Sequence, residues 1–202
     1  MWTFETFAAL AALAVASTWT PGPNNAMLAA SGATFGFRRT LPHAMGVALG
    51  FSLMMFLTAL GLAGLFKQSA LLREGLRWAG TALLLWIAWR IATARAPGAA
   101  GGPSRPFTFL QAAAFQWVNP KAWAMCVAVV SQFVAGAAPL REAASCALVF
   151  VASGLTSAHG WAAFGAGMGR VLGGGARLRA FNLCMGAMVA AGAAMLAVAD
   201  LG

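Results

Sequence analysis

The sequence predicts an all-α polytopic membrane protein with six transmembrane helices, arranged as two inverted three-helix repeats whose first helices are broken. Of its 202 residues, 61% are hydrophobic and 8% are charged, against about a quarter charged in an ordinary soluble domain. Apolar stretches of about 20 residues, long enough to cross about 30 Å of hydrocarbon, recur along the chain. Prolines interrupt the first of these stretches and the fourth.

The apolar stretches predict six membrane helices in two halves. We expect them at residues 4–31, 40–66, 69–93, 107–135, 141–168 and 178–199. Residues 94–106, ARAPGAAGGPSRP, form a Gly/Pro-rich linker between a first repeat, 1–93, and a second, 107–202. Because each repeat has an odd number of helices, the second enters the membrane from the opposite side, which makes the repeats inverted.

The first helix is expected to remain in the mature protein. Ala14-Val15-Ala16 is similar to the cleavage site of a secretory signal, but no Lys or Arg precedes it and Glu5 does. A signal peptide begins with a positively charged region.

Gly46 with Gly50, and Gly165 with Gly169, have the spacing of close helix packing.

The net charge of +9 is spread singly or in pairs at the ends of apolar segments, which indicates membrane topology and no nucleic-acid partner. Eight basic residues fall on one side and four on the other. The larger group is Arg38, Arg39, Arg90, Arg95, Arg105, Arg170, Arg177 and Arg179; the smaller is Lys67, Arg73, Arg77 and Arg141. The larger group predicts cytoplasmic first, third and fifth loops, with both termini outside the cytoplasm.

The first interruption lies in residues 17–25, STWTPGPNN. Pro21 and Pro23 donate no backbone hydrogen bond, so a helix there would release the carbonyls of Ser17 and Trp19. Such a break survives in a membrane only where protein buries it or where it lines a watery cavity. A kink patched by neighbouring helices is one interpretation, and a binding site that also uses the amides of Asn24 and Asn25 is the other.

The second interruption, Gln116-Trp117-Val118-Asn119-Pro120-Lys121, stands at the corresponding place in the second half. Either Lys121 extends to the membrane interface, or it places a cation at mid-membrane, where it costs about 2.5–3.5 kcal/mol. Interrupted helices in matching positions of two halves indicate a transport site. The candidate substrate-binding residues are therefore Pro21, Gly22, Pro23, Asn24, Asn25, Asn119, Pro120 and Lys121.

Two stretches carry a family resemblance: TPGPNNAMLAASGATFGFRRTLPHAMGVALG, and FQWVNPKAWAMCVAVVSQFV after the linker. Together with length and helix count, they resemble the lysine exporter (LysE) family, including its homoserine/threonine exporter-like amino acid efflux proteins. The resemblance implies export of amino acids or related small metabolites across the bacterial inner membrane, usually driven by protons. The chain departs from the family's usual pattern at two positions: Phe51 stands where the family commonly has an aspartate, and Ser131 stands where a proline is usual.

His159, in the fifth segment, is the candidate proton relay, because histidine gains and loses a proton near neutral pH. The other reading is a neutral histidine that holds a helix by a hydrogen bond. We expect His43 at the membrane interface and Cys126, Cys146 and Cys184 as packing residues, with no metal or cofactor.

The expected partners are a small-molecule substrate, protons and the lipid bilayer, and homo-oligomerisation stays open. The competing functions are an intramembrane enzyme, for which the sequence has no recognisable catalytic set, and a structural subunit of a membrane complex.

Overall fold

The computed structural model describes residues 2–62, 70–94, 105–135, 138–173 and 175–198. Within those ranges the chain forms eight α-helices, one π-helical turn and one 3-10 turn. The all-α prediction is confirmed. The predicted linker, 94–106, lies almost wholly outside the described residues, as do Lys67 and Arg95 of the charge count.

The helices follow the predicted segments. The first segment is α1 (Phe4–Trp19) and α2 (Pro23–Phe35), and the second is α3 (Phe37–Leu57) with the π turn Thr58–Leu62. The third is α5 (Ala70–Ala92). The fourth is α6 (Phe109–Phe115), the 3-10 turn Gln116–Val118 and α7 (Pro120–Phe133). The fifth is α8 (Pro139–Leu172) and the sixth is α9 (Gly175–Val198).

Three helical spans in the described part of the chain are long and apolar enough to cross a membrane on their own: Phe37–Leu62, Pro139–Leu172 and Gly175–Val198. The two broken segments supply shorter helices. At 1.5 Å per residue, the 16 residues of α1 and the 13 of α2 reach about 24 and 20 Å. Each is shorter than about 30 Å of hydrocarbon.

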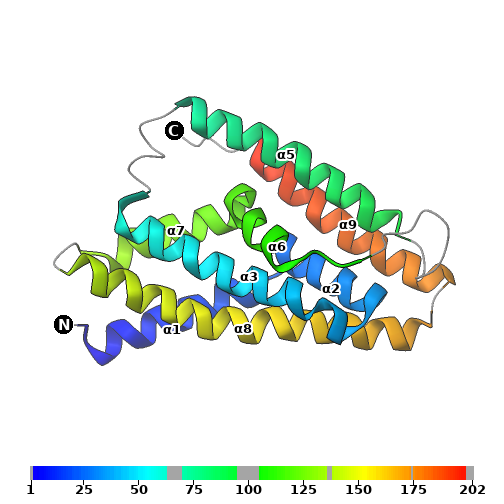
Figure 1. Ribbon diagram of the computed structural model, residues 1–202, viewed down its shortest axis with the longest axis horizontal. Coiled ribbons are helices and arrows are strands. Elements are labelled where there is room, and N and C mark those ends of the chain that lie inside the picture. Colours follow the sequence, from blue (N-terminus) through cyan, green and yellow to red (C-terminus); the bar gives the residue numbers. More distant parts are fainter. Residues whose placement is uncertain (1, 63–69, 95–104, 136–137, 174, 199–202) are drawn as a thin grey trace.

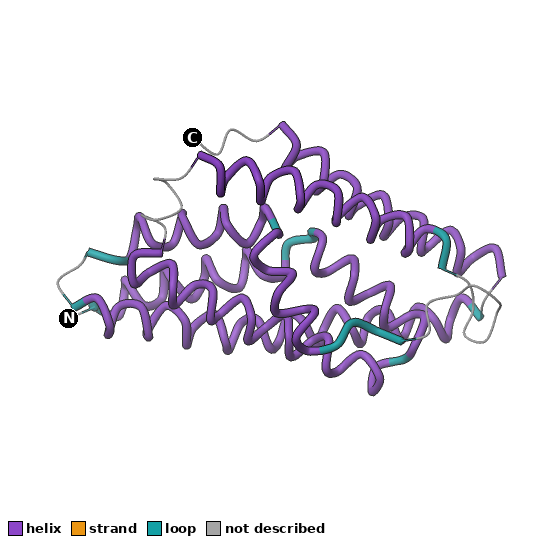
Figure 2. Tube along the Cα trace, turned by 45° about the horizontal axis from the view of Figure 1, so that its top comes forward, coloured by secondary structure: helices purple, strands orange, loops and turns teal. Residues whose placement is uncertain are grey.

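The helices pack in two groups with the second broken segment between them. In Figure 1, α8 runs beside α1, α2 and α3, while α5 and α9 pair along the other side, with α6 and α7 between. Figure 2 shows the same separation after a 45° turn. The helices on the two sides of each break belong to different hydrophobic clusters. Helices α1 and α7 contribute to a cluster around Phe150, whereas α2 and α6 contribute to one around Val189.

The helix crossings depend on glycines. A Cβ at Gly165 of α8 would lie 2.0 Å from the carbonyl oxygen of Ala29, and one at Gly32 of α2 would lie 2.2 Å from that of Ala162. An added Cβ at three more glycines would lie 2.3, 2.5 and 2.5 Å from the nearest backbone atom: Gly46, Gly50 and Gly169. The predicted close packing at both glycine pairs is confirmed. Gly32 of α2 also packs closely against α8, which the glycine spacing in the sequence did not predict.

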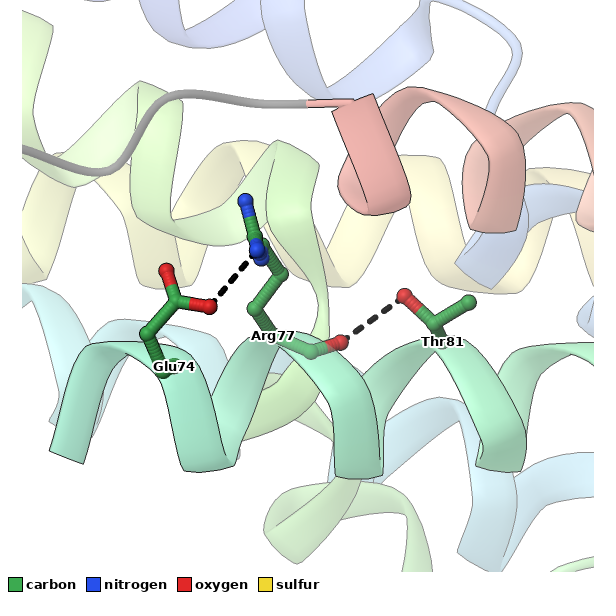
Figure 3. A network of polar contacts seen from close by, with 3 residues as sticks. All are labelled: Glu74, Arg77 and Thr81. Atoms are coloured by element: carbon green, nitrogen blue, oxygen red, sulfur yellow. Dashed lines mark hydrogen bonds and ion pairs between the residues drawn. The ribbon is translucent and has the colours of Figure 1, made fainter. Parts of the chain in front are cut away.

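Charge at the start of α5 is paired within the helix (Figure 3). The Arg77 guanidinium donates to Glu74 Oε2 at 2.6 Å, and the Thr81 hydroxyl donates to the Arg77 carbonyl at 2.8 Å. Arg77 also lies 5.0 Å from the ring centre of Trp78. These contacts hold the charged groups of Glu74 and Arg77 along the side of α5.

Candidate functional site

The first break is built by Gly22 and Pro23. Helix α1 ends at Trp19, Gly22 caps α2 in an extended conformation, and Pro23 is the first residue of α2, where its missing N–H costs nothing. The exposed Pro21 lies between them. The break therefore ends one helix and starts another instead of bending one.

The carbonyls left at the end of α1 receive side-chain donors. The Asn25 amide donates to Thr18 O and Thr20 O, both at 2.9 Å, and the Ser157 hydroxyl of α8 donates to Thr18 O at 2.7 Å. The sequence predicted free carbonyls at Ser17 and Trp19. The structure places these contacts one residue further along, and it adds Ser157, which sequence reasoning missed.

The second break is capped by Asn119. This residue is 2% exposed and its side-chain oxygen accepts from the Lys121 backbone N–H at 3.2 Å, while Pro120 is the first residue of α7. The carbonyl of Gln116, which Pro120 was expected to free, accepts instead from the Asn119 N–H at 3.2 Å. A 3-10 turn thus satisfies the backbone at this break.

Lys121 joins the two breaks. Its ammonium donates to Thr20 O, 101 residues away in the sequence, and its stem crosses Gly22. A Cβ on Gly22 would lie 2.9 Å from Lys121 Cδ, so the glycine leaves the room that the lysine occupies. The half-buried lysine bonds to the break of the other half of the chain.

Asn24 and Gln116 form a second link. Asn24 Nδ2 donates to Gln116 Oε1 at 2.8 Å, and Gln116 Nε2 donates back to Asn24 Oδ1 at 3.2 Å. Gln116 is fully buried and also donates to Ala112 O at 2.9 Å. Such reciprocal amide bonds fix the distance between two apolar helices. Sequence reasoning quoted Gln116 within the motif but gave it no role.

Both breaks open on one small cavity, here called the central cavity, of about 50 Å³. A water needs roughly 10–15 Å³ of such volume, so the cavity has room for only a few waters. Its polar lining is Ser17, Thr18, Asn24, Asn25, Asn119, Lys121 and Ser157. Phe51 forms part of the apolar wall, is 6% exposed and lies edge-to-face with Phe150 at 5.4 Å between ring centres.

The two histidines lie away from this cavity. The His159 ring donates from Nδ1 to Leu155 O at 2.7 Å, one turn back on α8, and its centre lies 6.3 Å from the ring of Phe37. His43, expected at the membrane interface, is 2% exposed and packs 5.4 Å from the ring of Phe107. Phe107, two residues before α6, covers the ring, and α6 itself packs along α3.

The described residues contain no group of three His, Cys, Asp or Glu side chains placed to hold a metal ion. Cys126 and Cys146 are buried and Cys184 is exposed, all three as free thiols.

An apolar, all-helical chain with two interrupted helices meeting at a small polar cavity has the architecture of a membrane transport protein. The chain belongs to the LysE type translocator family, whose model matches residues 15–200. It is therefore a multi-pass membrane protein and a transporter, not an enzyme. No solved structure matches the chain.

The chain is also similar to cysteine/O-acetylserine efflux proteins of Escherichia coli (strain K12), Shigella flexneri serotype 5b (strain 8401) and Shigella sonnei (strain Ss046). Each is 36% identical over 120 residues, which cover 57% of this chain and 58% of the relative. The chain thus matches little more than half the length of these relatives.

Proposed function

We propose that this protein exports a small amino-acid-type solute from the bacterial cytoplasm across the inner membrane, with the central cavity as its transport site. The observation that carries the proposal is the contact of the Lys121 ammonium with Thr20 O, which joins the two broken segments, together with the position of Lys121 in the lining of that cavity. An intramembrane lysine is costly and is kept where it binds or moves something.

The substrate class follows from the site and from the relatives. Lys121 presents a cation, Asn24 keeps a second amide hydrogen beside its bond to Gln116, and the Ser157 oxygen can still accept, which suits the carboxylate and amino groups of an amino acid. The relatives export cysteine and O-acetylserine by name. We propose solutes of that size, with the carboxylate on Lys121.

We propose an inverted repeat of six spans, residues 1–93 and 107–202, with both termini outside the cytoplasm. Three observations support it: the helices that would correspond, α3 with α8 and α5 with α9, pack against each other, and the two broken segments meet. A twofold axis in the membrane plane brings corresponding elements together in this way. Rocking of one half against the other would open the central cavity to each side alternately.

Proton coupling is part of the proposal, with His159 as the relay. The ring lies on α8 two residues after Ser157, whose hydroxyl holds the first break. A change in the charge of His159 would therefore act through the helix that touches the site, since the ring does not line the central cavity.

Flux through purified protein in liposomes tests the proposal. Vesicles loaded with radiolabelled cysteine or O-acetylserine should release the solute when a proton gradient is imposed. Lys121→Met keeps the apolar stem and removes the charge, so flux should fall to the rate of protein-free liposomes while membrane insertion stays normal. Lys121→Arg should restore part of it, because a planar guanidinium replaces a compact ammonium.

Arg141→Gln is the matched control. It removes one charge from an exposed residue at the start of α8 and should leave flux unchanged. Wild-type flux in the Lys121→Met protein would refute the transport site. Absence of flux in the wild type with both solutes would refute the proposed substrate class.

A further inference from the structure

A second cavity, here called the side cavity, lies between α2, α3, α5 and α6. Its volume is about 610 Å³, far larger than the central cavity and within the range of roughly 300–1,000 Å³ typical of small-molecule sites. It lies where α5 ends and α3 and α6 begin. The predicted charge asymmetry makes this the cytoplasmic end.

Two arginines from different segments line the side cavity. Arg90 comes from the last turn of α5, with its guanidinium 4.9 Å from the ring centre of Trp86, and Arg105 precedes α6. Both are exposed, and neither forms an ion pair with any described residue. Two exposed cations at one cavity, without an acidic partner among the described residues, make its opening positively charged, which favours anionic ligands.

A histidine lies at the wall of the same cavity. His43 is 2% exposed and neither ring nitrogen has a hydrogen-bond partner among the described residues. Both nitrogens are covered in this structure, and a buried polar group without a partner costs about 1–3 kcal/mol, so a ligand group that reaches the ring from the cavity gains a hydrogen bond there. The rest of the wall is largely apolar, with Ile87, Phe115 and Val118 among its residues.

We propose that the side cavity is a binding site for an organic carboxylate, which holds the exported solute before it reaches the central cavity. Arg90 and Arg105 take the carboxylate, His43 bonds a polar group deeper in, and the apolar wall covers the carbon skeleton. This inference rests on the proposed function, since it places the site on the intake side of an exporter.

The Asn24–Gln116 pair belongs to two segments that contribute residues to both cavities. Asn24 lines the central cavity, and Met27, one turn further along α2, lines the side cavity. Gln116 follows Phe115, which also lines the side cavity. The solute passes from one cavity to the other when this reciprocal amide pair separates.

Fluorescent ligand binding tests the site. The probe is dansylglycine, an apolar ring system with a carboxylate, and its control is dansylglycinamide, which lacks the charge. The protein is held in nanodiscs of neutral phosphatidylcholine. Dansylglycine should bind, and its fluorescence should rise. The amide should bind at least tenfold more weakly, because a tenfold loss of affinity corresponds to about 1.4 kcal/mol, less than one hydrogen bond to a charged group supplies.

Three variants and a control locate the binding. Arg90→Gln and Arg105→Gln should each weaken dansylglycine binding about tenfold, and His43→Phe, which keeps an aromatic ring but removes both nitrogens, about fivefold. Arg170→Gln, at the end of α8 and outside the cavity lining, should leave it unchanged. Equal binding of the two probes, or arginine variants that bind as the wild type does, would overturn the proposal.

The experiment separates a solute site from a lipid site and from the transport proposal. Phosphatidylglycerol in the nanodiscs should not displace dansylglycine; complete displacement would show that the arginines hold a lipid headgroup and would overturn the proposal. Lys121→Met should keep dansylglycine binding while losing flux. Binding that survives in a protein without flux upholds the side cavity alone, and wild-type flux without dansylglycine binding upholds the central site alone.

Discussion

Gly165→Ala is expected to push α8 away from α2 and to lower both stability and flux. The added methyl carbon would lie 2.0 Å from the Ala29 carbonyl oxygen, 2.6 Å from its carbonyl carbon and 2.7 Å from its Cα. All three are backbone atoms that no rotamer change can move. Restoring a 3.0 Å separation requires a displacement of at least 1.0 Å.

The size of the effect follows from that overlap. Overpacking a core costs about 1–3 kcal/mol, and each kcal/mol lowers the melting temperature of a chain of this size by about 2–4 °C. We expect the apparent melting temperature in detergent to fall by about 5 °C. Flux should fall too, since α2 begins at the first break and carries Asn24.

Gly167→Ala is the matched control. Gly167 lies two residues away on the same helix, with nothing within 4 Å of an added methyl group. Fluorescence-detected size-exclusion chromatography of heated samples measures both variants in parallel. If the Gly165→Ala protein has the same apparent melting temperature as the Gly167→Ala protein and the wild type, α2 and α8 do not approach as closely as the structure describes, and the reasoning fails.

Three other predictions follow from the site. Asn24→Ala and Gln116→Ala should each reduce flux and stability, and because they remove the same bonds, the double variant should cost less than their sum by about 0.6–1.7 kcal/mol; strict additivity would show that the pair does not act as a link. Phe51→Asp should leave insertion intact and alter substrate choice or the pH dependence of flux, since position 51 is in the wall of the central cavity; an unchanged pH profile and unchanged substrate range would contradict it. A reporter fused after Gly202 should appear outside the cytoplasm, and a cytoplasmic signal would refute the proposed orientation.

The sequence predicted the helices and their breaks because both depend on local chemistry. Apolar length defines the segments, and Pro23 and Pro120, which lack an N–H, can only start a helix or interrupt one. The structure uses both as helix starts. The glycine spacings on α3 and α8 likewise predicted close packing, which the backbone contacts confirm.

Partners across the fold could not be predicted in the same way. Ser157 and Gln116 are ordinary polar residues in apolar helices, and only the three-dimensional packing brings them to Thr18 and Asn24. The burial of the His43 ring depends in the same way on packing that no local pattern shows, because Phe107, two residues before α6, lies against it.

The packing also places Phe51 in the wall of the central cavity. Phe51 stands where the resemblance to the family led us to expect an aspartate, and it shares the central cavity with Lys121. Among the described residues that line this cavity none is acidic, so Lys121 bonds to a backbone carbonyl instead of a carboxylate. A carbonyl dipole compensates a cation less well than a carboxylate does, which leaves Lys121 free to exchange that bond for a better one. In the proposed transport function, the solute's own carboxylate becomes the counter-ion of Lys121, and binding of the solute neutralises the charge of the site.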